Sequence, residues 1–376
     1  MKNILYIFSL SILLLSCGQE KKEGRQLIKG ESISFPVNDL ASPNAGTAVL
    51  YDSDSGEHMF LYNHIIKQLQ ISQFPSNNLK LNIPLKFDQA QRVKSFSGGT
   101  LIARDSIFVT FYPPAIGLID FEGKLIHNER VGEDSYKVSH IGNGSSTPLF
   151  LVGGKIYGAQ PFLMDHHRMK AADIQKQHLV YSYDVAANSF QWHDVFYREG
   201  YWDEGKKLHY FAWAMRDDKI YLAPYFDHEI QVFDPLTNKV IEKKGVKSAH
   251  VNKFNLVNEI PGSPEEAVIN TLQSDQYEIF LYDKYRDVFY RIFLPGVEVD
   301  QGYKMEQLRL MERSRQSVGI MVLDKDLNVV SEYVFDHWEV HPQFLVGKKG
   351  LYVSTNNMYR DDFSDDYASY QLMVLE

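Results

Sequence analysis

The segment QVFDPLTNKVIE, residues 231–242, places alternating apolar residues on both sides of a polar turn and decides the fold. Asp234 stands at the first turn position, where its carboxylate can accept a hydrogen bond from the backbone two residues later. Asn238, four positions on, belongs to a residue type that tolerates a left-handed backbone. This combination predicts a β-hairpin with a four- or five-residue connection built on a type I turn.

Five other segments share this order of apolar strand, Asp or Asn, short turn and alternating strand. They are FLYNHIIKQLQI (60–71), GLIDFEGKLIHN (117–128), YSYDVAANSFQW (181–192), FLYDKYRDVFYR (280–291) and MVLDKDLNVVSE (321–332). From Asn63 through Asp120, Asp184, Asp234 and Asp283 to Asp324, the successive spacings are 57, 64, 50, 49 and 41 residues. The left-handed position is predicted at Asn188, Asn238, Asp287 and Asn328, and one residue earlier at Gly123. Repeats of about 40–50 residues with four strands each are typical of β-propellers.

A second recurring element lies upstream of the hairpins and predicts the inner strand of each unit. Its copies are DSIFVTF (105–111), GKIYGAQ (154–160), DKIYLAP (218–224) and KGLYVST (349–355). Aromatic residues make up 13% of the chain and no long apolar period of 3.6 residues occurs, so a nearly all-β protein is expected. A two-layer sandwich is the alternative fold, but it needs no repeat and rarely exceeds ~250 residues as one domain.

Six hairpins and a C-terminal remnant predict seven blades, with six or eight as alternatives. The isolated strand ESISFPVN (31–38) is expected to pair with the C-terminal sheet and close the ring, because closure removes exposed strand edges. No segment is rich enough in Pro and Gly to divide the chain. The sequence therefore predicts one propeller domain over residues 31–376.

The N-terminus has the features of a targeting segment. Lys2 precedes an apolar run, Ile4 to Leu15, that is shorter than the roughly 20 residues needed to span a membrane. The run ends in Leu-Leu-Ser-Cys, which resembles the bacterial lipobox and implies a signal peptide over 1–16 and lipidation of Cys17. Residues 17–30 are polar and predict a flexible tether. Gly18 in the second mature position implies the outer membrane, with its periplasmic or surface face left open.

Cys17 is the only cysteine, so a disulfide within the chain is excluded, and a buried core cysteine is the less favoured alternative. The formal net charge is −9 at pH 7, without the basic stripe that nucleic-acid binding requires. This charge indicates ordinary solubility rather than a particular partner. The partners expected are therefore the membrane, through Cys17, and a protein or glycan.

Together, the lipobox, the polar tether and a single propeller with these hairpins resemble a family of bacterial propeller lipoproteins, the domain of unknown function 4221. The resemblance covers nearly the whole mature chain. It implies the propeller fold and the lipid anchor, and it implies no reaction.

No catalytic residue, cofactor or metal site is predicted. The chain has no Gly-rich phosphate loop and no defensible Ser-His-Asp arrangement, and its one thiol would be lipidated. The segments DSDSG (52–56) and MDHHRM (164–169) lack a complete ligand set and predict a polar turn and a solvated insertion.

Two loops remain as candidate ligand-binding sites. Tyr201 and Trp202 lie in a Gly-bounded loop within an aromatic cluster. Core packing is the favoured interpretation of the cluster, and exposure of these two rings for binding a sugar or a protein is the alternative expectation. Asp361 and Asp362 lie in the last hairpin loop, where carboxylates could hold a cation or serve acid–base chemistry, although a solvated rim loop is the simpler interpretation.

The first functional hypothesis is a non-enzymatic, lipid-anchored scaffold for a protein or glycan. The alternative is a glycan-active hydrolase or lyase with carboxylates at the propeller axis. Several titratable side chains converging at the axis would argue against the passive scaffold.

Overall fold

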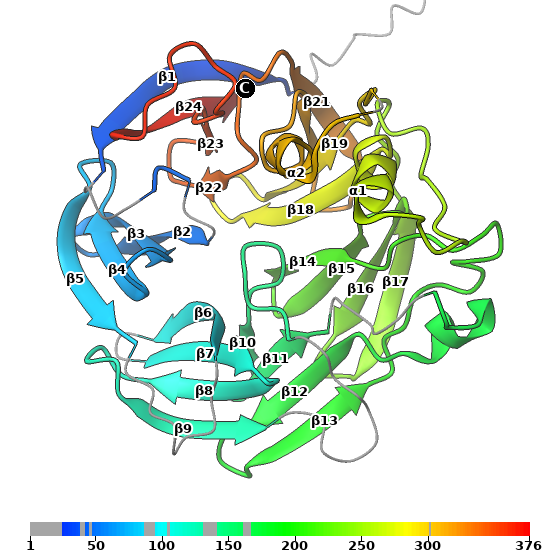
Figure 1. Ribbon diagram of the computed structural model, residues 1–376. Coiled ribbons are helices and arrows are strands. Elements are labelled where there is room, and N and C mark those ends of the chain that lie inside the picture. Colours follow the sequence, from blue (N-terminus) through cyan, green and yellow to red (C-terminus); the bar gives the residue numbers. More distant parts are fainter. Residues whose placement is uncertain are drawn as a thin grey trace, which may run out of the picture.

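The computed structural model describes residues 25–37, 42–44, 47–85, 95–103, 106–130, 141–160, 167–300 and 302–376. These residues form six antiparallel four-stranded sheets arranged as blades around a common axis (Figure 1). The strands β2, β6, β10, β14, β18 and β22 lie nearest the centre. The all-β propeller is confirmed, and the most favoured blade number, seven, is wrong: six, an alternative, is observed.

Each blade follows chain order from the axis outward, except that the sixth takes its outer strand from the N-terminus. Blades one and two contain β2 (Ala48–Ser53), β3 (Gly56–Asn63), β4 (Gln68–Gln73), β5 (Asn78–Pro84), β6 (Ser95–Ala103), β7 (Ser106–Tyr112), β8 (Ala115–Ile119) and β9 (Leu125–Arg130). Blades three and four contain β10 (Phe150–Val152), β11 (Lys155–Ala159), β12 (Val180–Asp184), β13 (Ser189–His193), β14 (Phe211–Arg216), β15 (Lys219–Pro224), β16 (Glu229–Asp234) and β17 (Lys239–Gly245). Blades five and six contain β18 (Gln276–Asp283), β19 (Val288–Leu294), β20 (Val318–Leu323), β21 (Val329–Phe335), β22 (Phe344–Val346), β23 (Leu351–Ser354), β24 (Tyr367–Leu375) and β1 (Leu27–Pro36).

The blade count differs because two predicted hairpins belong to one sheet. Segments 280–291 and 321–332 form the β18–β19 and β20–β21 hairpins of blade five. Helix α2 (Met305–Arg313) lengthens the connection between β19 and β20, so that the two hairpins of one blade are separated by 41 residues and resemble two repeats. The Asp-containing turn is a local device that can join any two consecutive strands, and its spacing does not measure the blade.

The predicted turn chemistry itself is confirmed at all six hairpins. In each, the Oδ1 atom of the first turn residue accepts one or two backbone N–H groups, at distances of 2.8–3.4 Å. Positive φ angles occur as predicted at Gly123, Asn188, Asn238 and Asp287. In the last hairpin the left-handed residue is Leu327 rather than Asn328, because this turn is one residue shorter, as in blade two.

The segments predicted as inner strands are the second strands of their blades. They form β7, β11, β15 and β23, and each is preceded by a strand nearer the axis that the sequence pattern did not reveal. The innermost strands β10 and β22 have only three residues each, which is too short for an alternating pattern to be recognised.

The predicted closure is confirmed, because β1 pairs antiparallel with β24 as the outer strand of blade six. The register runs from Leu27 opposite Leu375 to Pro36 opposite Tyr367. The strand begins at Leu27, so residues 27–30 belong to the sheet and not to the predicted tether. Cys17 and the rest of residues 1–24 lie outside the described residues.

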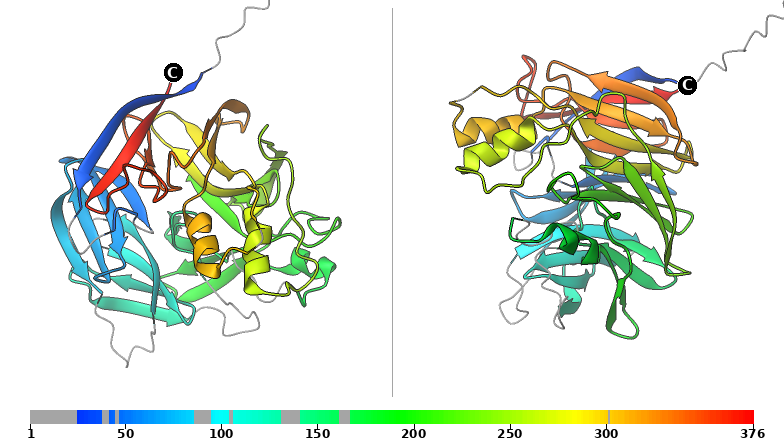
Figure 2. Two further views of the ribbon diagram at one scale, coloured as in Figure 1. Left: turned by 45° about the horizontal axis from the view of Figure 1, so that its top comes forward. Right: turned by 90° about the vertical axis from the view of Figure 1, so that its right-hand side faces the viewer.

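Two short helices were not expected from the nearly all-β pattern. Helix α1 (Pro264–Leu272) precedes β18, and α2 joins β19 to β20; they pack together through Val268, Leu272 and Leu308 and project from one face of the ring (Figure 2). Neither of them, nor any other helix within the described ranges, is long and apolar enough to cross a membrane.

Gly319 on β20 shows how tightly strands pack in blade five. A Cβ atom at this position would lie 2.0 Å from the ring of Phe293 on β19, which is fully buried. We expect Gly319→Ala to lower the free energy of unfolding by about 1–3 kcal/mol, because the ring has no free space to move into. Gly245→Ala is the control, since a Cβ there meets no atom within 4 Å. Urea unfolding of both variants tests this; equal stability would contradict the close approach.

Candidate functional site

A cavity of about 870 Å³ lies where four of the six blades meet at the axis. Its walls come from blades one, four, five and six and from the C-terminal ends of both helices. The lining residues are Ser42, Asn44, His64, Leu208, Tyr210, Tyr225, Phe226, Thr271, Gln276, Glu278, Glu312, Arg313, Ser314, Arg315, His341, Pro342 and Met358. We call this the axial cavity.

Arg315, just beyond the C-terminus of α2, is the most deeply buried charge in the axial cavity, with 1% of its surface exposed. Its Nη1 atom donates to the carbonyl oxygen of Leu272, the last residue of α1, at 3.5 Å. Its Nε atom has no hydrogen-bonding partner. Burial lowers the pKa of the guanidinium, although the negative charges of Glu278 and Glu312 oppose this shift. The side chain remains a cation whose hydrogen-bonding capacity is largely unused.

Glu278 projects from the third position of β18, where the strand register shifts between Tyr277 and Ile279. Such β-bulges redirect a side chain and often occur beside functional sites. Burial raises the pKa of the Glu278 carboxyl; the positive charge of Arg315 lowers it and the negative charge of Glu312 raises it further. No ion pair within 4 Å joins Glu278 to Arg315 among the described residues. The two opposite charges therefore share a cavity without touching.

His341 and a group of aromatic side chains complete the walls. Burial lowers the pKa of the His341 imidazole to about 4, so the ring is neutral at pH 7, and its Nδ1 atom has no hydrogen-bonding partner. Tyr210, Tyr225 and Phe226 supply ring surface beside these polar groups, and burial raises the pKa of both tyrosines. The cavity thus combines a cation, carboxyls, a neutral imidazole and aromatic faces.

Glu278 is expected to destabilise the folded protein at neutral pH. A carboxyl whose pKa is raised by folding binds its proton more tightly in the folded state, so its stability contribution is complete at acidic pH and is lost as the pH rises. Glu278→Gln removes the charge at constant size and should raise the melting temperature at pH 7, with no gain below the pKa of an unfolded Glu. Melting curves of wild type and variant from pH 3.5 to 8 test this. A gain that is equal at every pH would contradict it.

The structure contradicts the exposure expected for Tyr201 and Trp202, which are only 1% and 2% exposed. The Tyr201 hydroxyl donates to the Leu208 carbonyl at 2.8 Å, and the Trp202 indole Nε1 donates to the Lys207 carbonyl at 2.8 Å. Both rings belong to the core between blades three and four. They cannot present the exposed ring faces on which the binding prediction depended.

Asp361 and Asp362 lie in the loop between β23 and β24, as predicted, but outside the axial cavity. Two nitrogens of Arg360 donate to the two carboxylate oxygens of Asp362, each at 2.7 Å, which explains the lowered pKa of this carboxyl. Asp361 is exposed. The loop therefore has the structure of a charged rim, and it brings no second carboxylate to face Asp362.

The remaining motifs have no assembled site. Residues 52–56 form the polar β2–β3 hairpin turn that the sequence indicated. Of the histidine-rich segment, residues 164–166 lie outside the described residues. Within the described part of the chain, no group of three or more His, Cys, Asp and Glu is placed to hold a metal ion.

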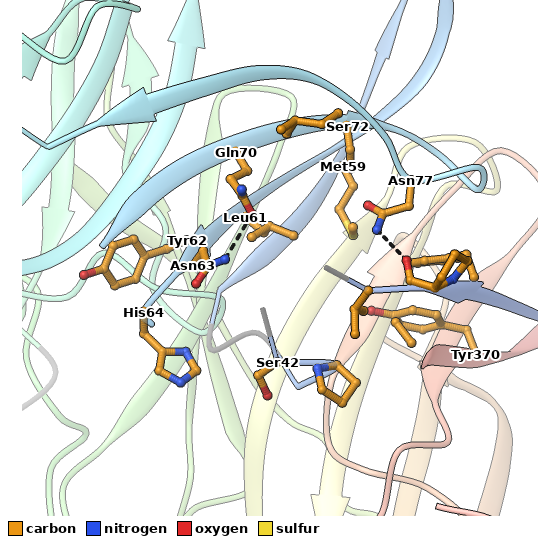
Figure 3. Close-up of a pocket in the computed structure, with 16 residues that line it drawn as sticks. Ser42, Met59, Leu61, Tyr62, Asn63, His64, Gln70, Ser72, Asn77 and Tyr370 are labelled. Carbon is orange, nitrogen blue, oxygen red and sulfur yellow. Dashed lines mark hydrogen bonds between the residues drawn. The ribbon is translucent and has the colours of Figure 1, made fainter. Parts of the chain in front are cut away.

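A second, smaller pocket of about 300 Å³ lies at the seam between blades one and six (Figure 3). Met59 and Leu61 line it from β3 and Tyr370 from β24, and none of the described residues that line it is a carboxylate, lysine or arginine. Its amides bind their neighbours: Asn63 donates to Gln70 at 3.3 Å and Asn77 to the Pro36 carbonyl at 2.9 Å. These satisfied contacts make the axial cavity the better candidate site.

The residues of the axial cavity were not identified from the sequence. One signal was available for Glu278, because it is a carboxylate that interrupts a run of apolar and aromatic residues inside the strand segment QYEIFLYD (276–283). Arg315 and His341 gave no such signal, since each lies in an irregular segment before a strand.

Comparisons with known proteins support the fold. The domain of unknown function DUF4221 matches residues 31–333. A DUF4221 member from Bacteroides vulgatus ATCC 8482 superposes with a TM-score of 0.79 at 18% identity, covering 95% of this chain and 99% of the other. A putative exported protein from Bacteroides fragilis NCTC 9343 superposes with a TM-score of 0.54 at 7% identity, covering 93% and 95%. No curated protein matches significantly.

At these identities the solved structures show a shared fold and nothing about a ligand. The family match covers most of the chain, which confirms the resemblance inferred from its hairpins. The chain belongs to the DUF4221 family.

Proposed function

We propose that this propeller is a binding module that holds a glycan in its axial cavity. The observation that carries the proposal is the pair of opposite charges, Arg315 and Glu278, that share the cavity without contacting each other. Arg315 is buried and Glu278 is partly buried, and charges in such places are costly without a direct partner, which points to an external one. By the criterion set from the sequence, the converging titratable side chains count against a passive scaffold, and they are also the observation that favours the catalytic alternative below.

A glycan suits this cavity better than a protein surface does. The volume of about 870 Å³ falls within the ~300–1,000 Å³ typical of small-ligand sites. Tyr210, Tyr225 and Phe226 offer faces for sugar rings, while Glu278 and His341 offer polar atoms for hydroxyl groups. A flat protein epitope would reach few of these atoms.

A glycan library screened with purified protein tests the proposal. Thr271 lines the cavity from α1, so Thr271→Trp should fill the space and abolish binding, while the melting temperature shows that the fold is retained. Glu265→Trp, on the first turn of the same helix and outside the cavity, is the matched control and should bind as wild type does. Equal binding by both variants would place the ligand elsewhere, and no binding by wild type would reject the glycan.

A glycan-active enzyme is the second candidate, favoured by the presence of Glu278 and Glu312 in one cavity. A carboxyl with a raised pKa can protonate a glycosidic oxygen while a second carboxylate activates the water that adds across the broken bond. The second carboxylate, Glu312, is held in place by an ion pair with Arg309 at 2.5 Å. Release of new reducing ends from a bound glycan, lost in Glu278→Gln while binding persists, would support catalysis; binding without turnover would reject it.

We further propose that Cys17 is lipidated and anchors the module at the outer membrane, on the basis of the Leu-Leu-Ser-Cys motif. Two or more acyl chains hold a protein on a membrane where a single chain binds only marginally. Cys17→Ala should move the protein from the membrane fraction to a soluble one. Continued membrane association of this variant would refute the anchor.

A further inference from the structure

Arg315 has a structural role that accounts for only part of its hydrogen-bonding capacity. The Leu272 carbonyl that it contacts stands at the C-terminus of α1, where a cation is favoured by the helix dipole. A guanidinium has five N–H donors in a planar fork, and this contact, at 3.5 Å, uses one of them. This contact with the end of the helix therefore explains why a cation stands at position 315. It uses only one of the five N–H donors of the guanidinium.

The carboxylates nearby do not fill this vacant capacity. Glu312, in the last turn of α2, forms its ion pair with Arg309, at 2.5 Å. Glu278 interacts electrostatically with Arg315, yet no hydrogen bond or ion pair joins them in the described chain. Arg315 is thus a buried cation beside an open volume, with an unpartnered Nε atom.

We infer that the ligand of the axial cavity is an acidic sugar, whose carboxylate binds the free edge of Arg315 while a neighbouring hydroxyl donates to Glu278. This inference rests on the proposed glycan function and specifies its ligand. A planar carboxylate can accept two parallel bonds from a guanidinium fork. A hydroxyl beside it supplies the donor that an ionised Glu278, an acceptor only, requires.

The same charges favour a carboxylate over a phosphate. A phosphate monoester carries about −1.5 to −2 at pH 7 and would be repelled by both Glu278 and Glu312. A carboxylate carries a single negative charge and is therefore repelled less by these two groups than a phosphate is. The affinity should therefore depend on the charge and shape of the ligand's anionic group, and not only on whether such a group is present.

The test compares matched monosaccharides, D-glucuronate, D-glucose and glucose 6-phosphate, by calorimetry against the full mature chain at low salt. We expect glucuronate to bind at least tenfold more tightly than glucose, since a charge-assisted pair is about twice as strong as a neutral hydrogen bond. Equal binding of glucose and glucuronate overturns the acidic sugar and leaves the glycan proposal standing. Tighter binding of glucose 6-phosphate than of glucuronate overturns the carboxylate assignment. No binding by any of the three sugars overturns this inference, and the library screen then decides the broader glycan proposal.

Two variants test whether Arg315 and Glu278 cause the preference for glucuronate over glucose. Arg315→Gln should abolish the advantage of glucuronate over glucose; because this position is buried and could affect folding, Glu278→Gln provides an independent measurement. It removes a like charge and an acceptor, so glucuronate should lose less affinity than glucose does, and their ratio should rise. An unchanged ratio in a folded Glu278→Gln protein would overturn the assignment of these two groups to one ligand.

Discussion

A chain shortened to begin at Val37 is expected to yield aggregated or unfolded protein, whereas a chain that begins at Arg25 is expected to fold normally. The difference between them is β1, whose pairing with β24 closes the ring between blades six and one. Its Leu27 and Phe35 are each 4% exposed and belong to two different core clusters. Burying such side chains contributes about 1.5–3 kcal/mol each, before the lost strand pairing is counted.

The total loss should exceed the roughly 5–15 kcal/mol by which proteins of this kind are stable. Without β1, β24 would also present an unpaired edge, which favours association with other chains. Size-exclusion chromatography and far-UV circular dichroism of both shortened proteins provide the measurement. A monomeric, cooperatively folding protein that begins at Val37 would show that β1 is not needed for closure.

Arg291→Met is expected to lower the free energy of unfolding by about 3–5 kcal/mol. Arg291 lies on β19 of blade five with none of its surface exposed. Its guanidinium donates to four carbonyl oxygens of blade four, those of Pro224, Asp227, His228 and Val246, at 2.7–3.3 Å. It also stacks on the Tyr277 ring, 3.5 Å from the ring centroid. The variant leaves these buried carbonyls without donors.

Burial lowers the pKa of Arg291 to about 10, so the group remains charged at neutral pH and the effect should be nearly constant between pH 6 and 8. Arg291→Lys should recover part of the loss, because three donors on a flexible stem replace a planar fork. Lys349→Met removes an exposed ion pair with Glu31 and should cost less than about 1 kcal/mol. Chemical unfolding of the three variants provides the measurement. Similar losses of unfolding free energy for Arg291→Met and Lys349→Met would show that the buried hydrogen bonds of Arg291 do not stabilise the fold.

The features that could be predicted from the sequence are those specified by residues close together in the chain. An Asp at a turn position bonds backbone groups two to four residues away, so Asp120 or Asp234 specifies its hairpin whatever surrounds it. The closing strand was found because it had no neighbour to pair with. Blade number was not encoded locally, because the same turn serves the first, second or third connection within a blade.

The candidate site depends on contacts that no local pattern contains. Glu278, Arg315 and His341 are separated by 37 and 26 residues and meet only because the ring closes around them. Tyr201 illustrates the opposite error: its loop has the composition of an exposed turn, yet its ring packs under Lys207, whose Nζ atom lies 4.7 Å from the ring centroid. Burial in this loop is decided by neighbouring blades rather than by the bounding glycines.

The direction of β24 and β1 determines the face of the ring from which both ends of the described chain leave. β24 starts at Tyr367, after the Met358 loop that borders the axial cavity, and ends at Leu375 beside Leu27. The first described residues and the C-terminus therefore leave from the face opposite α1 and α2 (Figure 2). If Cys17 holds the chain to a bilayer, the cavity and its helices point away from the lipid, toward molecules arriving from the aqueous side.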